Sequence, residues 1–411
     1  MPTHKQYPVT FLFLLSLCFK LLSLIMTTGP KTDHSFYKDD HFNNRFVKHS
    51  DLQQKVAELQ LSGIFTVQTA GLSVQNREIW RLSIGNGPIV ILLWSQMHGD
   101  EPTGTLAFMD LFNFFINREY TAEISSQILN SCTLHFVPML NPDGAEVFQR
   151  RNAQGIDINR DFVARQSPEA KILIQMQQEL QPHFGFNMHD QDTLWSVTGT
   201  RLPASISLLA PPADQHAAVT PSREKAILLI SGLYEMLEKE IPGHTGRWSE
   251  DFESRAFGDN FQRLGTSVIL VEAGGHENDT EKQYVRKLNF DILIRSLIEI
   301  SNGTYIDHQL STYYAIPLNE KGIFHLLIRN CVVNTEAGQI KADIGLNYME
   351  VITLKDQQAS RIYQVEDFGD LSTWNGYEVI DVNGAAAFTV VTKNGNTLSF
   401  REGVLEEKVS I

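Results

Sequence analysis

The chain has 411 residues, of which 42% are hydrophobic and 20% are charged, and its formal net charge is −14. This length exceeds what one hydrophobic core usually supports, so we expect a main domain and a smaller second unit. The acidic balance, without a long Lys/Arg block, excludes the electrostatic footprint of a protein that grips a phosphate backbone. Nucleic acid is therefore not an expected partner.

Residues 1–30 form an apolar segment that differs from the rest of the chain. Lys5 is followed by the run VTFLFLLSLCFKLLSLIM, which resembles the charged and apolar regions of a secretory signal and is compatible with export to the periplasm or cell envelope. Lys20 interrupts this run, no clear small-residue cleavage site follows it, and Met26 is an alternative start for a cytoplasmic protein. Both compartments stay open.

From residue 66 onward, short apolar runs alternate with helical patterns. Residues 66–85 predict two strands joined at SVQNRE, and PIVILLWS is typical of a strand buried on both faces. Further strands are predicted at CTLHFVPML, FGFNMH, SISLLAP and TSVILVEAGG, and helices at 105–117, 169–180, 222–239 and 281–300. The alternation predicts an α/β fold with a central sheet over residues 31–305.

The sequence pattern changes near residue 306. The runs there are short, β-rich and separated by turn residues, and they are FHLLIRN, QIKADIGL, YMEVITL, RIYQVED, YEVIDV, AFTVVT and NTLSF. We therefore predict a small all-β domain over residues 306–411.

Polar side chains follow four of the predicted strands, at the point where each strand ends. They are His98 and Glu101 after PIVILLWSQM, Asn141 and Asp143 after HFVPML, His189 and Asp190 after FGFNM, and Glu272 after TSVILV. Ligands of open α/β sheets bind outside the carboxyl ends of the strands. We therefore expect these side chains to line one crevice.

Three of these residues form a candidate metal site. Gly99, between His98 and Glu101, is expected to let the backbone bend tightly so that both side chains reach one ion, and His189 supplies a second imidazole. A His-Glu-His set with an open fourth position is a known catalytic zinc arrangement. The two cysteines of the body, at positions 132 and 331, lack the spacing of a sulfur-bound zinc site or a disulfide framework, so we expect buried thiols and one zinc ion held by imidazole and carboxylate.

Each feature has an ordinary explanation when it is taken alone. An HxxE pattern arises often by chance, His189 is compatible with a buried core histidine, and Glu272 could pair with Arg286. Glu272 nevertheless ends an apolar run, where an unpaired carboxylate is costly. The combination of features favours a site.

The motifs MHGDE, LNPDGAEVFQRRNAQGIDINRDF, FNMHDQ and ILVEAGG, in this order and at these separations, resemble the zinc carboxypeptidase family typified by carboxypeptidase A. The resemblance covers about residues 60–302 and leaves the N-terminal segment and the β-rich region unexplained. It implies a mixed, mostly parallel sheet flanked by helices, and a metallocarboxypeptidase that uses one zinc ion. The substrate class it implies is a peptide, cleaved at its C-terminal amide bond.

The resemblance also implies hydrolytic roles. The same His-Glu-His set becomes the three zinc ligands, and Glu272 becomes the general base that takes a proton from the attacking water and passes it to the leaving amine. Arg150, in QRRN, matches the arginine that stabilises the developing oxyanion, with the adjacent Arg151 as a second candidate.

Three residues of the DINRD motif match supporting roles. Asn159 and Arg160 match the pair that grips the terminal carboxylate of the substrate, where a guanidinium fork gives bidentate recognition. Asp157 matches the carboxylate that orients a metal-bound imidazole, here that of His98. Taken alone, these residues are also compatible with a solvated loop of turn formers.

The sequence departs from the family pattern in one respect. Typical members carry a tyrosine on a mobile loop before the catalytic glutamate, but no tyrosine lies between Tyr234 and Glu272. Closure over the substrate would then use Phe252, Phe257 or another group, or the substrate would differ in shape from a peptide C-terminus.

Two alternatives to a peptidase stay open. A deacylase or amidase on the same scaffold would cleave N-acyl amino acids or cell-wall peptides with the same four central residues. An inactive binding module, whose β-rich domain recognises a partner, is disfavoured because the three ligands and Glu272 are all present. The sequence identifies no stable protein partner.

Overall fold

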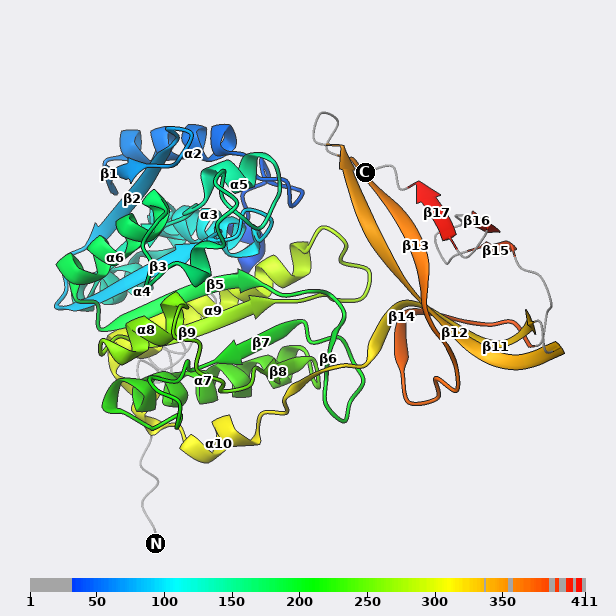
Figure 1. Cartoon of the computed structure of the whole chain (residues 1–411). Helices are drawn as coiled ribbons and strands as arrows, with labels where there is room; N and C mark the ends of the chain where they lie inside the picture. The colour runs from blue at the N-terminus through cyan, green and yellow to red at the C-terminus, as the bar shows by residue number, and fades with distance from the viewer. Residues whose placement is uncertain are drawn as a thin grey trace, which may run out of the picture.

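The computed structural model describes residues 32–335, 338–353, 358–383, 389–391, 397–401 and 404–408. The signal-like segment predicted over residues 1–30 lies outside these ranges. Among the described residues, no helix has the length and apolar character needed to cross a membrane. Two large β-sheets organise the chain, one flanked by helices and one standing beside it (Figure 1).

The first sheet has eight strands in the order β1-β2-β4-β3-β5-β9-β7-β8. They are β1 (Thr66–Leu72), β2 (Glu78–Gly85), β3 (Ile89–Ser95), β4 (Cys132–Val137), β5 (Phe184–Asp190), β7 (Ile206–Leu209), β8 (Thr245–Arg247) and β9 (Ser267–Ala273). The central strands β4, β3, β5 and β9 pair in parallel, whereas β1 with β2, β2 with β4, and β7 with β9 are antiparallel. This mixed sheet confirms the predicted fold class.

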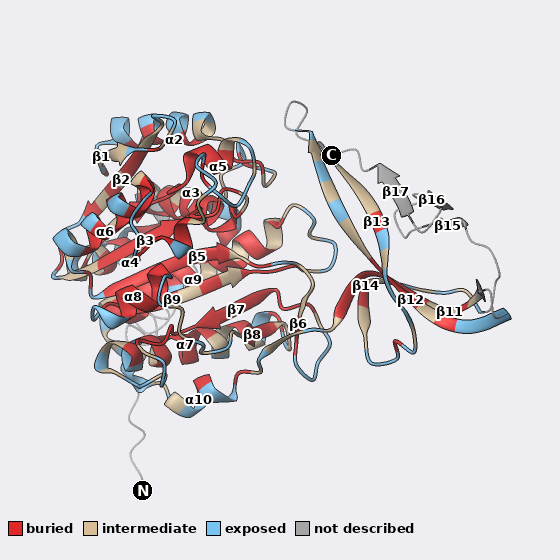
Figure 2. Cartoon of the chain, viewed as in Figure 1, coloured by how far each residue is buried: buried red, intermediate tan, exposed pale blue. Residues whose placement is uncertain are grey.

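Helices cover both faces of this sheet. One face packs against α2 (His49–Ser62), α3 (Thr103–Ile116), α4 (Arg118–Ser131), α7 (Pro221–Glu240) and α9 (Gln283–Asn302), and the other against α6 (Pro168–Leu180) and α8 (Phe257–Arg263). Buried residues are concentrated in the strands and in the helix faces turned toward them (Figure 2). The sheet is thus the centre of the main hydrophobic core.

Two of these helices begin with the same local signal. The hydroxyl oxygen of Ser167 accepts a hydrogen bond from the Ala170 amide at the start of α6, and that of Thr220 accepts one from the Arg223 amide at the start of α7. A proline follows each capping residue, where its missing N–H would have no helical partner. Both helices therefore begin within one residue of the predicted start.

The strand order locates the crevice in which ligands of such sheets bind. The chain passes from β3 to β4 on one side of β3 and then to β5 on the other side. A crevice forms outside the carboxyl ends of the strands where the order reverses in this way. His98 and Glu101 follow the carboxyl end of β3, so they lie at this reversal.

The chain leaves the first sheet gradually. Helix α10 (Leu310–Ala315) places Tyr313 in the main core, and β10 (Asn319–Lys321) pairs with β6 (Trp195–Val197). Contacts with the domain of the first sheet therefore extend beyond residue 306. The domain boundary near residue 306 stays a prediction.

The second sheet has seven strands in the order β14-β11-β12-β13-β17-β16-β15. They are β11 (Ile323–Thr335), β12 (Gly338–Thr353), β13 (Gln358–Gly369), β14 (Asn375–Asp381), β15 (Thr389–Val391), β16 (Thr397–Arg401) and β17 (Val404–Lys408). Strand β12 is continuous where two separate runs were predicted, and the predicted run AFTVVT lies partly outside the described residues. The separate small core of this sheet, which contains Leu326, Ile344 and Leu346, supports the predicted all-β unit.

Candidate metal centre

Three neighbouring strands deliver the central side chains to one place. His98 and Glu101 follow β3, His189 lies in β5, and Glu272 lies in β9. In the parallel pairing of β5 with β9, His189 and Glu272 are direct partners. Four residues that are far apart in the sequence therefore meet at the carboxyl edge of the sheet, as predicted.

Gly99 is needed for a reason other than the predicted one. Its φ is not among the positive values, and the left-handed residue of this turn is Gln96, with φ 48°. A Cβ atom at Gly99 would lie 2.0 Å from the carbonyl carbon of Gly144, so the backbone of α5 (Pro142–Glu146) passes too close for any side chain. The glycine permits a close approach of two backbones.

The ligating atoms of His98, Glu101 and His189 all lie within 4.8 Å of one another, and the three residues are buried. Glu101 Oε1 lies 2.7 Å from His98 Nδ1, and Oε2 lies 2.7 Å from His189 Nδ1. Both histidines thus turn the same ring nitrogen toward one carboxylate. Two imidazoles and a carboxylate in this arrangement fit a catalytic zinc ion.

The carboxylate and the imidazoles of this cluster stabilise each other's charged forms. Burial alone would raise the pKa of Glu101, but the charges and hydrogen bonds of His98 and His189 outweigh it and lower that pKa. Burial alone would lower the pKa of His98, yet the Glu101 charge and the hydrogen bond to Asp157 raise it to about 9. Glu101 is therefore held ionised, as a metal ligand must be.

Asp157 fixes the orientation of the His98 ring. Its Oδ1 lies 3.1 Å from His98 Nε2, and the same oxygen accepts a hydrogen bond from the Asn159 amide. When His98 Nε2 carries the proton and donates it to Asp157, Nδ1 presents its lone pair to the cluster. This is the place that the resemblance implied for Asp157.

Glu272 lines the same cavity as the cluster. Burial raises the pKa of its carboxyl well above the usual value, and the nearby Glu101 charge raises it further. Pairing with Arg286, the ordinary explanation for Glu272, is wrong, because Arg286 forms a buried ion pair with Asp110 between α9 and α3. The carboxyl therefore faces the cavity.

The remaining predicted residues lie around this cavity of about 220 Å³. Arg150 lines it and donates from Nη1 to Glu101 Oε1 at 3.1 Å, whereas the neighbouring Arg151 donates to the Gly155 carbonyl outside it. Asn159 and Arg160 also line the cavity, and Arg160 Nη1 donates to the Asn159 carbonyl at 2.8 Å. Of the two adjacent arginines, Arg150 alone faces the cluster.

Two of the polar residues predicted to line the crevice do not reach it. Asn141 caps α5 by accepting a hydrogen bond from the Gly144 amide, and Asp143 pairs with Arg77 at 2.7 Å and accepts from Ser73. Their Asn-Pro-Asp-Gly context is that of a helix start with proline in the first turn. That prediction was wrong, and the capping signal was already present in the sequence.

Two tryptophans complete the cavity wall and were not predicted. Trp195 and Trp248 both line it, with ring centroids 4.6 Å apart in an edge-to-face arrangement. The indole Nε1 of Trp248 is buried and has no hydrogen-bond partner. Phe257, one proposed substitute for the missing tyrosine, is instead fully buried in the core beneath. Of the two tryptophans, Trp248 lies between Tyr234 and Glu272, the stretch in which the family tyrosine is missing.

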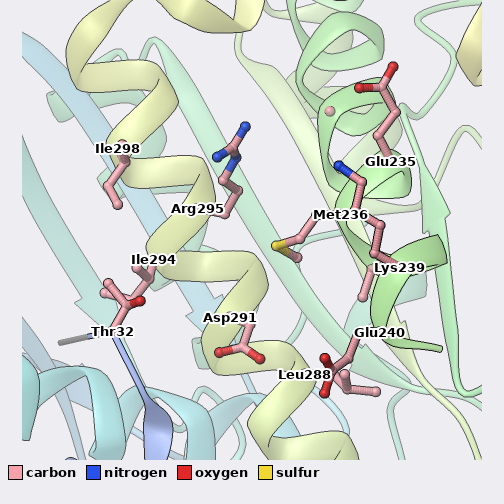
Figure 3. Close-up of a pocket in the computed structure, with 12 residues that line it drawn as sticks. Thr32, Glu235, Met236, Lys239, Glu240, Leu288, Asp291, Ile294, Arg295 and Ile298 are labelled. Atoms are coloured by element: carbon pink, nitrogen blue, oxygen red, sulfur yellow. The ribbon is translucent and has the colours of Figure 1, made fainter.

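A larger cavity of about 490 Å³ lies between α7 and α9, away from the metal cluster (Figure 3). Apolar side chains such as Met236, Leu288 and Ile294 line part of it, and Glu240 and Asp291 are both paired with Lys287. None of the predicted site residues lies there. Size alone does not identify the functional site of this molecule.

Comparisons with known proteins identify relatives of part of this chain. Residues 52–204 match the family model for zinc carboxypeptidase, which confirms the resemblance over this part of the chain. Carboxypeptidase SOL1 of Arabidopsis thaliana is 29% identical over 125 residues, which are 28% of this chain and 26% of that protein. Carboxypeptidase E of Caenorhabditis elegans is 31% identical over 153 residues, which are 31% of this chain and 32% of that protein. The chain therefore matches about a third or less of the length of each relative.

A solved structure extends the likeness in fold beyond the matched residues. Thrombin activatable fibrinolysis inhibitor superposes with a TM-score of 0.52 at 11% identity, covering 67% of this chain and 80% of that one. At this identity the likeness concerns the fold alone.

Proposed function

We propose that this protein is a zinc-dependent metallocarboxypeptidase that hydrolyses the C-terminal amide bond of peptides, since residues 52–204 match the zinc carboxypeptidase family model. The observation that carries the proposal is that one cavity is lined by all the residues that the reaction needs. The buried His-Glu-His cluster, the Glu272 carboxyl, and the Asn159-Arg160 pair all line it.

The cluster formed by His98, Glu101 and His189 would hold the ion. When bound there, zinc polarises a carbonyl and lowers the pKa of water toward roughly 7. Glu272 accepts a proton from the attacking water and then donates it to the leaving amine, and its raised pKa suits a group that must hold a proton between these steps. Burial in the shared cavity keeps this carboxyl beside the reacting atoms.

The cationic residues complete the reaction site. Arg150 is a fixed donor beside the cluster and stabilises the oxyanion that develops on the scissile carbonyl. Arg160 offers a guanidinium fork to the terminal carboxylate of the substrate, and Glu253, 3.4 Å from its Nε, restrains the arginine side chain. Asn159 is held by the Phe257 amide, which donates to its Oδ1 at 2.9 Å.

The test is amino acid release by the zinc-loaded wild type and by Glu272→Gln on a mixed set of short peptides. We expect the wild type to release single C-terminal residues, and the variant to lose about 10²- to 10⁴-fold in kcat because it lacks the general base. Glu179→Gln, an exposed change on α6, is the matched control and should keep the wild-type rate.

Two results would contradict the proposal. Equal rates for the wild type and Glu272→Gln would remove the assigned role of the carboxyl. Release of amino acids from N-acyl amino acids, but from no peptide, would instead identify a deacylase on the same site.

A further inference from the structure

Three cavities adjoin one another along the segment Asp190–Thr193, which leaves β5 toward β6. The metal cavity shares five lining residues with a second cavity of about 370 Å³, and these are Glu101, Arg150, Asp190, Gln191 and Asp192. The second cavity shares Arg45, Thr193 and Lys282 with a third of about 160 Å³. The three cavities therefore lie in a row from the metal cluster to the second sheet, and each shares wall residues with the next.

The third cavity lies between the two domains. One wall comes from the loop after β9, which includes His276 and Thr280. The opposite wall comes from the second sheet, with His325, Tyr348, Arg361, Tyr363, Tyr377 and Glu378. The β-rich domain, which the family resemblance leaves unexplained, thus borders a row of cavities that begins at the metal ligands.

We propose that the three cavities form one substrate groove, in which the second domain binds the part of a peptide that lies upstream of the scissile bond. The inference rests on the proposed peptidase function and names its substrate class as extended peptides, in preference to N-acyl amino acids. We call this row of cavities the interdomain groove.

The order of residues along the row of cavities gives the peptide its direction. Asn159, Arg160 and Glu272 line the metal cavity but not the second cavity. The terminal carboxylate is therefore held at one end, and the chain upstream of the cleaved bond continues past Glu101 toward the second cavity. The upstream part of the peptide therefore does not contact Arg160, which binds the terminal carboxylate.

The second domain fixes the floor of the interdomain groove through Thr193. Tyr377 Oη donates to the Thr193 carbonyl at 2.6 Å, and His325 Nε2 lies 3.0 Å from Thr193 Oγ1. His325 Nδ1 accepts from the Tyr348 amide at 3.2 Å, so in the neutral ring Nε2 carries the proton that Thr193 Oγ1 accepts. Burial lowers the pKa of His325 to about 3, which keeps the ring neutral.

Ion pairs also connect the segments that border these cavities. Lys321, next to the second sheet, pairs with Asp192 at 2.8 Å, and Arg45 of the first domain pairs with Glu350 of β12 at 2.6 Å. The Lys321 pair and the Thr193 contacts thus attach the segment Asp190–Thr193 to β10 and to the second sheet, and the Arg45 pair joins the two domains directly. The interdomain groove is thus already formed in the structure.

The lining of the third cavity suits an uncharged stretch of peptide better than it suits a charged side chain. Its cations are balanced by carboxylates, since Arg45 and Arg361 both approach Glu350 and Lys282 pairs with Asp190. The uncharged part of its lining is mainly aromatic, with Tyr348, Tyr363 and Tyr377, and such a lining suits peptide groups and uncharged side chains. We therefore expect affinity to rise with each upstream residue that enters the interdomain groove.

The test measures the Kd of acetylated peptides of two to six residues with a common C-terminal dipeptide, by calorimetry on the zinc-loaded Glu272→Gln full-length protein. We expect Kd to fall about tenfold or more between the shortest and longest peptide. Adding Tyr348→Ala should abolish most of that gain, whereas adding Phe368→Ala, an exposed aromatic on β13 outside the interdomain groove, should keep it. Melting curves establish that both variants are folded.

The wild-type enzyme, assayed on the same peptides, separates this inference from the proposed function. A Kd that does not change with length, together with release of the C-terminal residue, would overturn the interdomain groove and leave the peptidase in place. Binding that tightens with length, without hydrolysis of any peptide, would support the interdomain groove and overturn the peptidase. If Tyr348→Ala keeps the gain in affinity with peptide length, as Phe368→Ala is expected to do, the second domain does not have the assigned role.

Discussion

Glu101 connects the parts of the centre to one another. Its two carboxylate oxygens face the two histidines, and Oε2 also accepts from the Asp190 amide at 3.2 Å, at the start of the segment that lines the interdomain groove. Arg150 Nη1 donates to Oε1, the oxygen that also faces His98. Loss of this carboxylate would therefore disturb the proposed metal site, the proposed oxyanion donor Arg150 and the Asp190 backbone together.

Trp248 leads to a prediction at the residue scale. Because its buried indole N–H has no partner and its side chain lines the metal cavity, we expect this N–H to donate a hydrogen bond to the substrate once it is bound. Trp248→Phe keeps an aromatic ring but removes this donor, so kcat/KM for peptide release should fall about fivefold, corresponding to roughly 1 kcal/mol.

The matched control for Trp248→Phe is Trp374→Phe. Trp374 stacks on Phe324 in the second domain, with ring centroids 4.6 Å apart, and lines none of the three adjoining cavities. Its replacement should leave kcat/KM unchanged. A Trp248→Phe enzyme as active as this control would show that the indole N–H makes no bond to the substrate.

The sequence could predict the residues of the centre because each lies at or just after the carboxyl end of a strand of recognisable pattern. His98, Glu101, His189 and Glu272 stand where apolar runs stop, and the sheet brings such ends together. Trp195 and Trp248 could not be found in this way. Indoles are ordinary core residues in sequence, and only the tertiary approach of β6 and the segment after β8 makes these two part of a cavity wall.

At the scale of elements, a buried ion pair joins α3 to α9. Asp110 and Arg286 are both fully buried, and Arg286 Nε donates to Asp110 Oδ2 at 2.7 Å. His34 approaches the same carboxylate at 2.7 Å, so the start of the described chain is held to both helices. Removing one partner would leave an uncompensated charge in the core.

The prediction for this pair concerns stability. Asp110→Ala should lower the free energy of unfolding by about 3–5 kcal/mol, because Arg286 would stay buried without its partner. Urea unfolding followed by circular dichroism would measure the change. Glu179→Ala, which removes the partner of Arg81 at the surface, should cost less than about 1 kcal/mol. Equal effects of the two changes would contradict this account of the buried pair.

The helices that could be predicted are those with an unambiguous apolar pattern or start signal. Helix α3 is buried over most of its length, and α6 and α7 carry Ser-Pro and Thr-Pro starts. Helix α4 was missed because few apolar residues, such as Ile124, Ile128 and Leu129, mark its buried side. Helix α2 was missed although Leu52, Val56 and Leu59 follow helical spacing, so the signal was present there.

At the scale of the whole molecule, the two domains share one functional surface in this account. The separate β-rich region could be predicted from its short runs, but its position beside the metal cavity could not. That position depends on single contacts, such as Tyr377 with Thr193 and Arg45 with Glu350, between residues that no local pattern links. The continuity of β12 likewise depends on pairing with β11 and β13 along its length.

Zinc binding tests the central claim most directly. Calorimetric titration of the metal-free protein with zinc should give one ion per chain, and His189→Ala should weaken binding by at least about tenfold, because one of three ligands is lost. His216→Ala, an exposed histidine outside the cluster, should bind as the wild type does. Stoichiometric zinc that depends on His189 is the predicted result. A protein that binds no zinc, or binds it equally well without His189, would contradict the assignment of this cluster as the metal centre.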